Sequence, residues 1–169
     1  MYMFRCFNRK TDNRMSTDSY MKIAISEAYK GIRKNHGGPF GAVIVKDGKI
    51  IAKGHNRVVK KNDPTRHGEI DAIRKACRKL RTFDLSGCVL YTTGEPCPMC
   101  LCACMWANIN KIYYACSLED NSLIGFRDSN FESVIGNRDL MNGYLIPVDK
   151  KDALKLFDDY NNLVGKTSY

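Results

Sequence analysis

The sequence lacks any run of eighteen consecutive apolar residues, which is about the length that a transmembrane helix requires. It also contains no internal repeat and no low-complexity tract, so repeat architectures are excluded. The opening seven residues are too short and too interrupted for a secretory signal peptide. We therefore expect a globular protein that does not enter the membrane.

The length and composition suit one domain. A chain of 169 residues with 44% hydrophobic composition can bury a normal core. Residues 1–14 carry four basic side chains and little hydrophobic periodicity. We expect residues 1–16 to be a disordered N-terminal extension and residues 17–169 to form a single domain.

The eight cysteines are unevenly placed, because four of them lie between Cys97 and Cys104. This spacing favours metal binding over a disulfide framework, and it indicates a reducing, cytoplasmic location. We interpret five of the cysteines as small apolar packing residues, namely Cys77, Cys88, Cys102, Cys104 and Cys116. Two of the three histidines, His36 and His55, do not stand at a metal-ligand spacing from another candidate ligand. We interpret them as loop or turn residues.

The net charge of +9 is concentrated in residues 1–84, which hold 20 Lys and Arg against 8 Asp and Glu. The densest basic cluster, between Arg74 and Arg81, falls on a predicted helix. Because no aromatic residues are interleaved to stack on bases, we interpret this cluster as a solvated helix face.

The segment Glu95-Pro96-Cys97-Pro98-Met99-Cys100 indicates half of a metal site. Two thiols at i and i+3 face one point if the first immediately precedes a helix and the second lies in its opening turn. The prolines favour a helix start here, since a proline is tolerated at the first helical position. A helix N-terminus also favours the thiolate, which is the form that binds metal.

His67-Gly68-Glu69 indicates the other half, again after a proline at a predicted helix start. The imidazole of His67 joins Cys97 and Cys100 as a third ligand. A structural zinc site normally has four protein ligands, whereas a catalytic one has three and leaves a position for water. The sequence therefore predicts one catalytic zinc ion per chain, with Glu69 placed to move protons on and off the water.

The spacing His67-x-Glu69 followed by Pro96-Cys97-x-x-Cys100 is the signature of zinc-dependent nucleobase deaminases. The chain resembles the cytidine deaminase superfamily over roughly residues 18–165, including residues 38–45 and 62–65. This resemblance implies an α/β fold with three αβα layers around a mostly parallel, five-stranded mixed sheet.

The hydrophobic pattern agrees with alternating strands and helices. We predict a first helix capped by Thr17 or Asp18 and ending at Gly37-Gly38, followed by a hairpin around Asp47-Gly48. The remaining predicted elements are a helix over 66–81, a strand over 88–92, a helix over 98–108 and a strand over 111–115. Ligands in such sheets bind where strands end and helices begin, and both halves of the motif fall there.

Resemblance also assigns residues around the substrate. Asn56, otherwise an ordinary turn residue, matches an asparagine that contacts the substrate in related deaminases, and Phe40 matches a wall of the base pocket. Asp128, otherwise a solvated loop acid, matches an aspartate that assists proton transfer in bacterial guanine deaminases. The terminal Tyr169, otherwise a frayed end, matches a tyrosine that closes their pocket.

The activity that we expect is hydrolysis of the small-molecule nucleobase guanine to xanthine and ammonia. The alternative is a tRNA adenosine deaminase, which the basic N-terminal half favours and the acidic residues Asp152, Asp158 and Asp159 oppose. A non-catalytic module held together by zinc is a third hypothesis, and it would need a fourth protein ligand. Resemblance further implies a homodimer, with exchange of C-terminal segments between subunits as one form of it. Nucleic acid is a partner only under the alternative.

Overall fold

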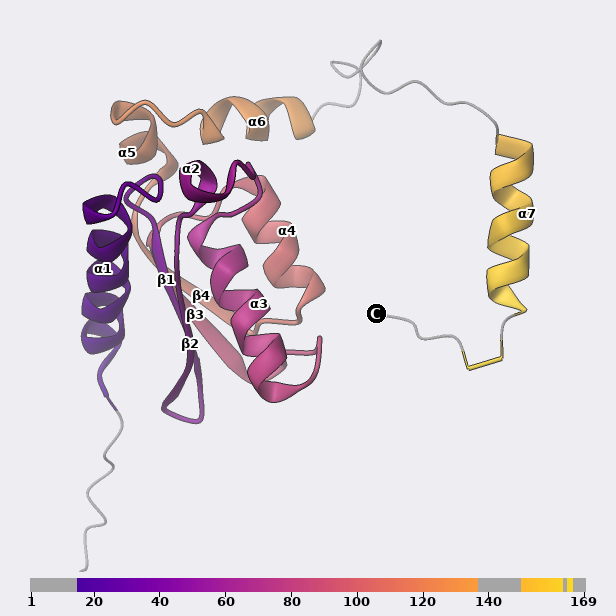
Figure 1. Cartoon of the computed structure of the whole chain (residues 1–169), viewed down its shortest axis with the longest axis horizontal. Helices are drawn as coiled ribbons and strands as arrows, with labels where there is room; N and C mark the ends of the chain where they lie inside the picture. The colour runs from indigo at the N-terminus through magenta and orange to yellow at the C-terminus, as the bar shows by residue number, and fades with distance from the viewer. Residues whose placement is uncertain (1–14, 137–149, 163, 166–169) are drawn as a thin grey trace, which may run out of the picture.

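A computed structural model describes residues 15–136, 150–162 and 164–165 (Figure 1). The elements, in chain order, are α1 (Thr17–Arg33), β1 (Gly41–Lys46), β2 (Lys49–His55), α2 (Val58–Lys61), α3 (Gly68–Leu80), β3 (Cys88–Gly94), α4 (Pro98–Trp106), β4 (Lys111–Cys116), α5 (Leu118–Leu123), α6 (Asp128–Ile135) and α7 (Lys150–Asn161). The N-terminal extension up to residue 14 and the predicted pocket residue Tyr169 lie outside the described residues. No helix in the described ranges is long and apolar enough to cross a bilayer.

The strand order of the sheet is β2-β1-β3-β4. β1 pairs antiparallel with β2 and β3, and β3 pairs in parallel with β4. The predicted α/β class is confirmed, but the sheet has four strands within the described residues rather than five, and only one of its pairings is parallel. Most pairings are antiparallel because β1 lies between β2 and β3 and runs antiparallel to both. The Asp47-Gly48 turn, with φ of 50° and 72°, folds β2 back beside β1. The crossover through α3 then places β3 on the opposite side of β1.

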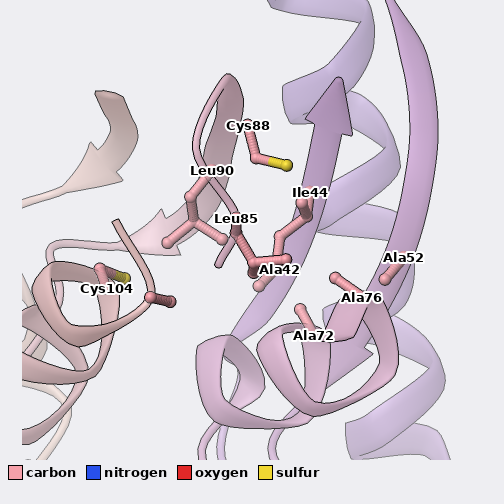
Figure 2. Packing of buried hydrophobic residues seen from close by; sticks show 10 residues of the cluster. Ala42, Ile44, Ala52, Ala72, Ala76, Leu85, Cys88, Leu90 and Cys104 are labelled. Atoms are coloured by element: carbon pink, nitrogen blue, oxygen red, sulfur yellow. The ribbon is translucent and has the colours of Figure 1, made fainter. Parts of the chain in front are cut away.

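The three predicted layers are present, with α1 on one face of the sheet and α3 and α4 on the other (Figure 1). Alternate residues of β1 point to opposite faces, as the two-residue period of a strand requires. Ala42 and Ile44 join the core under α3 and α4, which Figure 2 shows. Val43 and Val45 join the core under α1. β1 is therefore the central strand, buried on both sides.

The first helix is capped one residue earlier than predicted. The Ser16 side chain accepts a hydrogen bond from the Ser19 N–H at 3.2 Å, so Ser16 is the N-cap in place of Thr17 or Asp18. The helix ends at Arg33, before the predicted Gly37-Gly38. Asn35, with φ of 51°, turns the chain out of the helix and leaves residues 36–40 as a loop that leads to β1.

The functional end of the sheet is the end at which β2 and β3 lead towards α3 and α4. Figure 1 shows α2, α5 and α6 gathered across this end. It shows α7 apart from the sheet and its covering helices. The site described next is therefore built by two helix N-termini below and by loops and short helices above.

Candidate catalytic metal site

The three predicted ligands come together at two helix N-termini. His67 is the N-cap of α3 and Cys97 is the N-cap of α4, and both have the extended backbone conformation that precedes a helix. Cys100 lies in the first turn of α4, as its i+3 spacing from Cys97 predicts. Pro98 occupies the first position of α4, where its missing N–H leaves no bond unmade. The residues around each helix start therefore determine where the three ligands lie.

The geometry of these residues fits zinc. One ligand atom from each of His67, Cys97 and Cys100 lies within 4.8 Å of the others, and this is the only such group among the described residues. The distance from His67 Nδ1 to Cys97 Sγ is 3.6 Å. Zinc bonds of about 2.3 Å to sulfur and 2.0–2.1 Å to nitrogen, set at a tetrahedral angle, give a separation of about 3.6 Å. Three ligands leave one tetrahedral position for water or substrate.

The charges of the ligands are coupled. The hydrogen bond from the Cys100 thiol, together with His67, lowers the pKa of Cys97 to about 4, although burial opposes this shift. The same bond and burial raise the pKa of Cys100, so the metal-free pair holds one proton. The bond to Cys97 raises the pKa of His67. A thiolate is thus present before metal arrives, which favours binding of a soft or borderline cation.

Glu69 lies beside the ligands in the first turn of α3 and is only 4% exposed. Its Oε1 accepts a hydrogen bond from Thr92 Oγ1 at 3.3 Å, and its Oε2 lies 3.5 Å from Cys100 Sγ. Burial raises the pKa of Glu69, so this carboxyl group holds and releases a proton at a higher pH than an exposed one. Thr92, fully buried in β3, was not singled out from the sequence because only the strand register brings it to Glu69.

Two hollows meet at His67, Phe126 and Asp128. The inner hollow has a volume of about 10 Å³, which is the space of about one water molecule, and is lined by Phe40, His67, Glu69, Glu95, Cys97, Phe126 and Asp128. The outer cleft has a volume of about 410 Å³, within the range of small-molecule sites, and is lined by Gly37, Gly38, Asn56, Val58, Val59, Pro64, His67, Phe126, Arg127, Asp128 and Phe131. A reacting water and a flat base therefore have adjacent places.

Asp128 reaches this site from the start of α6. Burial, followed by the nearby Cys97 thiolate, raises the pKa of Asp128. Its Oδ2 is 3.5 Å from Asn121 Nδ2, and Asn121 is itself only 2% exposed. Sequence reasoning missed Asn121 and Phe126, because both depend on how α5 and the loop after it fold back over β3. The ring of Phe126 packs edge-on against Phe40 at 4.7 Å between centroids.

Asn56 is almost fully buried at the end of the β2 segment and lines the outer cleft. Its Oδ1 accepts a hydrogen bond from the Val58 N–H at 3.1 Å, and the backbone N–H of Asn56 donates to the Phe40 carbonyl oxygen at 2.8 Å. These bonds hold the amide at the wall of the cleft. The structure thus brings Phe40, Asn56, Glu69 and Asp128 around the three ligands, and Tyr169 is the one predicted site residue outside the described ranges.

The remaining cysteines divide by helix and strand geometry. Cys104 and Cys88 are buried in the core under α3 and α4, as predicted (Figure 2). Cys102 and Cys116 are exposed, so the interpretation of both as packing residues is wrong. Cys102 lies two residues from Cys100, which puts it on the opposite side of α4. Cys116 belongs to β4, which is an edge strand with mostly exposed side chains.

The sequence matches the family described as the cytidine and deoxycytidylate deaminase zinc-binding region over residues 15–116. The chain belongs to this family. Membership confirms the resemblance inferred from the motif, and it makes the protein a zinc-dependent hydrolytic enzyme.

Guanine deaminase from Bacillus subtilis (strain 168) is 50% identical over 115 residues, which are 68% of this chain and 74% of that protein. Its X-ray structure superposes with a TM-score of 0.85 and 40% identity, covering 92% of this chain and 99% of the other. The tRNA-specific adenosine deaminase of Aquifex aeolicus (strain VF5) is 45% identical over 60% of this chain and 66% of its own length. A guanine deaminase structure from Nitrosomonas europaea has a TM-score of 0.64 and 33% identity, covering 67% of this chain and 65% of the other. The likeness to the first relative therefore extends well beyond the matched family region.

Proposed function

We propose that the protein hydrolyses guanine to xanthine and ammonia. The observation that carries this proposal is the meeting of two carboxyl groups, the buried Glu69 and the half-buried Asp128, in one hollow with His67 and Cys97. Deamination requires a proton to leave water and a proton to reach the departing amine, and two carboxyl groups with raised pKa can serve both. The choice of guanine rests on the relatives from Bacillus subtilis and Nitrosomonas europaea.

In the proposed mechanism, His67, Cys97 and Cys100 hold the metal. When bound, zinc supplies a Lewis acid that lowers the pKa of a water in the open position. Glu69 removes a proton from the attacking water and delivers it to the ring nitrogen beside C2. Once the carbon is tetrahedral, Asp128 donates a proton to the amino group, the C2–N bond breaks and ammonia departs. The new C2 hydroxyl gives its proton back to Asp128 as the carbonyl of xanthine forms. Water is consumed, xanthine is formed, and no redox step is needed.

The base is held from the other side. In this proposal the Asn56 amide hydrogen bonds to the edge of the ring, since its position is already fixed by the Val58 N–H. Phe40 forms a wall of the inner hollow, and Tyr169 closes the outer cleft over the base. A closed pocket suits a free base, because a ribose at N9 would need the exit to remain open.

The test is ammonia release by zinc-loaded protein from a panel of guanine, guanosine, cytosine and a tRNA anticodon stem-loop. We expect guanine to be turned over, guanosine far more slowly and the stem-loop not at all. A variant without Tyr169 serves as the internal comparison. It should turn over guanine more slowly, keep its zinc and discriminate less strongly against guanosine. Turnover of the stem-loop without guanine turnover would refute the proposal.

The second candidate is deamination of adenosine in tRNA, which the Aquifex relative and the basic face of α3 favour. Arg74, Arg78 and Lys79 would then contact phosphates. Replacing Arg74 and Arg78 with glutamine distinguishes the two, because loss of phosphate contacts weakens RNA binding and its salt dependence. Guanine turnover by the same variant should be unchanged under the first proposal.

We further propose a homodimer in which C-terminal segments are exchanged. The support is the apolar surface of α7. This helix stands apart from the sheet (Figure 1), and its Leu154, Leu156 and Phe157 are 47%, 64% and 62% exposed. A second copy of this chain can cover that surface. Mixing Glu69→Gln chains with chains that lack Tyr169 tests exchange. Activity should return in the mixture if the intact tail of one chain completes the site of the other.

Two broader proposals accompany this one. We infer that residues 17–169 act as a single domain, which the 92% structural coverage by the Bacillus relative supports. We also propose a reducing, cytoplasmic location, which the free state of every cysteine in the described ranges supports. Mass measurement after thiol alkylation, without prior reduction, tests the second point. All eight cysteines should be alkylated once the protein is denatured.

A further inference from the structure

Three ionisable side chains are buried next to the site but have no part in the proposed chemistry. Glu27 of α1, His36 of the following loop and His55 at the end of β2 are 8%, 8% and 6% exposed. His36 Nδ1 lies 2.9 Å from His55 Nε2, and the two rings are within 20° of parallel. His55 Nδ1 lies 3.6 Å from Glu27 Oε2, and Glu27 Oε1 accepts a hydrogen bond from Lys30 Nζ at 2.6 Å. His36 is a loop residue, as predicted, whereas His55 belongs to β2, so its interpretation as a loop or turn residue is wrong.

The contacts define where the protons lie. Although burial opposes it, Lys30 together with His55 holds the pKa of Glu27 below its usual value, so Glu27 is a carboxylate. A carboxylate facing His55 Nδ1 favours a hydrogen on that nitrogen, because that atom has no other partner among the described residues. His55 Nε2 is then an acceptor, and His36 Nδ1–H donates to it.

The hydrogen bond between His36 and His55 exists only while a single hydrogen lies between His36 Nδ1 and His55 Nε2. Protonating His55 on Nε2 would set two N–H groups against each other at 2.9 Å. Burial lowers the pKa of both histidines. The charges facing His36 are Lys60, Arg57 and Lys34, which act in the same direction. Those facing His55 are Arg57, which lowers its pKa, and Glu27 and Asp71, which raise it. The neutral, hydrogen-bonded pair is thus the state at neutral pH.

Each histidine immediately precedes a residue of the cleft wall. Gly37 follows His36 and Asn56 follows His55, and both line the outer cleft. A Cβ atom at Gly37 would overlap Asn56 Oδ1, so the two segments are in close contact at this point. The His36 carbonyl oxygen also accepts a hydrogen bond from the Lys60 N–H at 3.0 Å, which ties the loop to α2. The hydrogen bond between the rings therefore holds the loop after α1 against the end of β2 and fixes the backbone that carries the Asn56 side chain.

We propose that His36 and His55 are positioning residues that hold the Asn56 amide in place for the base, and that acid weakens base binding by breaking their hydrogen bond. This inference rests on the proposed function, in which Asn56 contacts guanine. The rings themselves touch neither the ligands nor the substrate in this scheme. Their loss should therefore change KM, which reports base binding, and leave kcat, which depends on Glu69 and Asp128.

The side chains of asparagine and glutamine allow matched variants. The amide nitrogen of asparagine can take the place of imidazole Nδ1, so His36→Asn keeps a donor towards His55. The amide of glutamine can take the place of imidazole Nε2, so His55→Gln keeps an acceptor towards His36. His36→Leu has similar bulk but no donor, and it leaves His55 Nε2 buried without a partner. A merely space-filling role predicts the opposite order, because leucine preserves the volume better than asparagine.

The experiment measures guanine kinetics on zinc-loaded proteins between pH 5 and pH 9. Leaving His55 Nε2 buried without a partner destabilises the arrangement that holds Asn56, so we expect His36→Leu to raise KM about tenfold while kcat changes less than about twofold. His36→Asn should stay within about threefold of the wild type in both. The wild-type KM should rise as the pH falls through the lowered pKa of the pair. That rise should vanish in the double variant His36→Asn, His55→Gln, which has no titratable group there.

A readout without substrate separates failure of this inference from failure of the proposed function. Nitrogen-15 spectra of histidine-labelled protein should show His55 protonated on Nδ1 and His36 donating from Nδ1. If wild-type protein does not act on guanine, the proposed function fails, whatever these spectra show. If guanine is turned over but His36→Leu has the wild-type KM at every pH, or if both rings are doubly protonated at pH 7, the positioning role is overturned.

Discussion

The metal side and the base side of the site are built in different ways. The metal side consists of side chains at two helix N-termini, His67 on α3 and the Cys97–Cys100 pair on α4, which rest on the shared core. The base side consists of Asn56 and Phe40 on loops and of Asp128 on a short helix beyond residue 116. The metal side follows from a few neighbouring residues at each helix start. The base side depends on how the loops around β1 and β2 and the helices α5 and α6 pack together at this end of the sheet.

This difference separates chemistry from specificity. Ligand spacing, a proline at a helix start and a helix dipole are sufficient to hold zinc and to place Glu69 beside it. Nothing in that set distinguishes guanine from another base. Under the proposed function, the contacts that distinguish guanine come from loops, and the His36–His55 pair is one of the buried contacts that hold these loops in position. Substitutions on the two sides should therefore have separable effects, from loss of metal to changes of KM alone.

The largest effect should follow loss of a ligand. Cys100→Ala removes one of three zinc ligands, and we expect zinc content to fall from one per chain to near zero and turnover to be lost. Cys104→Ala is the matched control, because Cys104 lies one turn further along α4 but is buried in the core. It should keep its zinc and its turnover at a cost of about 1 kcal/mol in unfolding free energy. Elemental analysis decides, and zinc loss from Cys104→Ala would mean a fourth protein ligand and a structural site.

The next effect should come from the proton carrier on the metal side. Glu69→Gln keeps the shape of the side chain and removes the acid–base group, so we expect kcat to fall by about 10²–10⁴-fold with zinc and fold retained. Circular dichroism and zinc content measured on the same sample establish that the fold is intact. A wild-type kcat in this variant would reduce Glu69 to a carboxylate that merely stabilises the start of α3.

On the base side, Asp128→Asn should be less severe. We expect kcat to fall about 10–10²-fold, because protonation of the leaving amine becomes harder while the attacking water is still activated. Glu119→Gln, an exposed carboxyl group on the neighbouring α5, is the control and should be neutral. Single-turnover measurements at saturating guanine isolate the chemical step. An effect of Asp128→Asn confined to zinc content would move this residue to the metal side.

The smallest effect should come from the support of Glu69. Thr92→Val removes the hydrogen bond to Glu69 Oε1, and we expect kcat/KM at neutral pH to fall about five- to tenfold, whereas Thr92→Ser should retain it. Burial already raises the pKa of Glu69, and losing a donor to the carboxylate raises it further. The base form is then lost at a higher pH, so the acid limb of the kcat/KM profile should move to higher pH in Thr92→Val. An unmoved limb would show that Thr92 does not support the carboxylate.

The predictions from sequence were accurate where the controlling interactions are local. His67, Cys97 and Cys100 were identified because three or four neighbouring residues fix each helix start. The Asp47-Gly48 hairpin was identified for the same reason. The insertion of β1 between β2 and β3 was missed, since alternation of strands and helices does not specify the side on which a crossover returns.

The parts that could not be predicted depend on contacts between distant segments. His36 and His55 are nineteen positions apart on a loop and a strand end, and no periodicity links them. Asn121 and Phe126 come to the site only because α5 and the following loop cross the end of β3. The family resemblance supplied Asn56 and Asp128, which the residues themselves would have left as turn and loop residues.

In the proposed function, one zinc ion held by His67, Cys97 and Cys100 is required for guanine turnover, and Glu69 carries the proton. The most direct test is xanthine formation from guanine as zinc is added stepwise to metal-free protein. We expect no xanthine without zinc and a linear rise in the rate of xanthine formation that stops at one equivalent of zinc per chain. Glu69→Gln should bind the same amount of zinc but form almost no xanthine. If fully zinc-loaded wild-type protein forms no xanthine, or if metal-free protein forms it at the full rate, the site does not act as a zinc-dependent guanine deaminase.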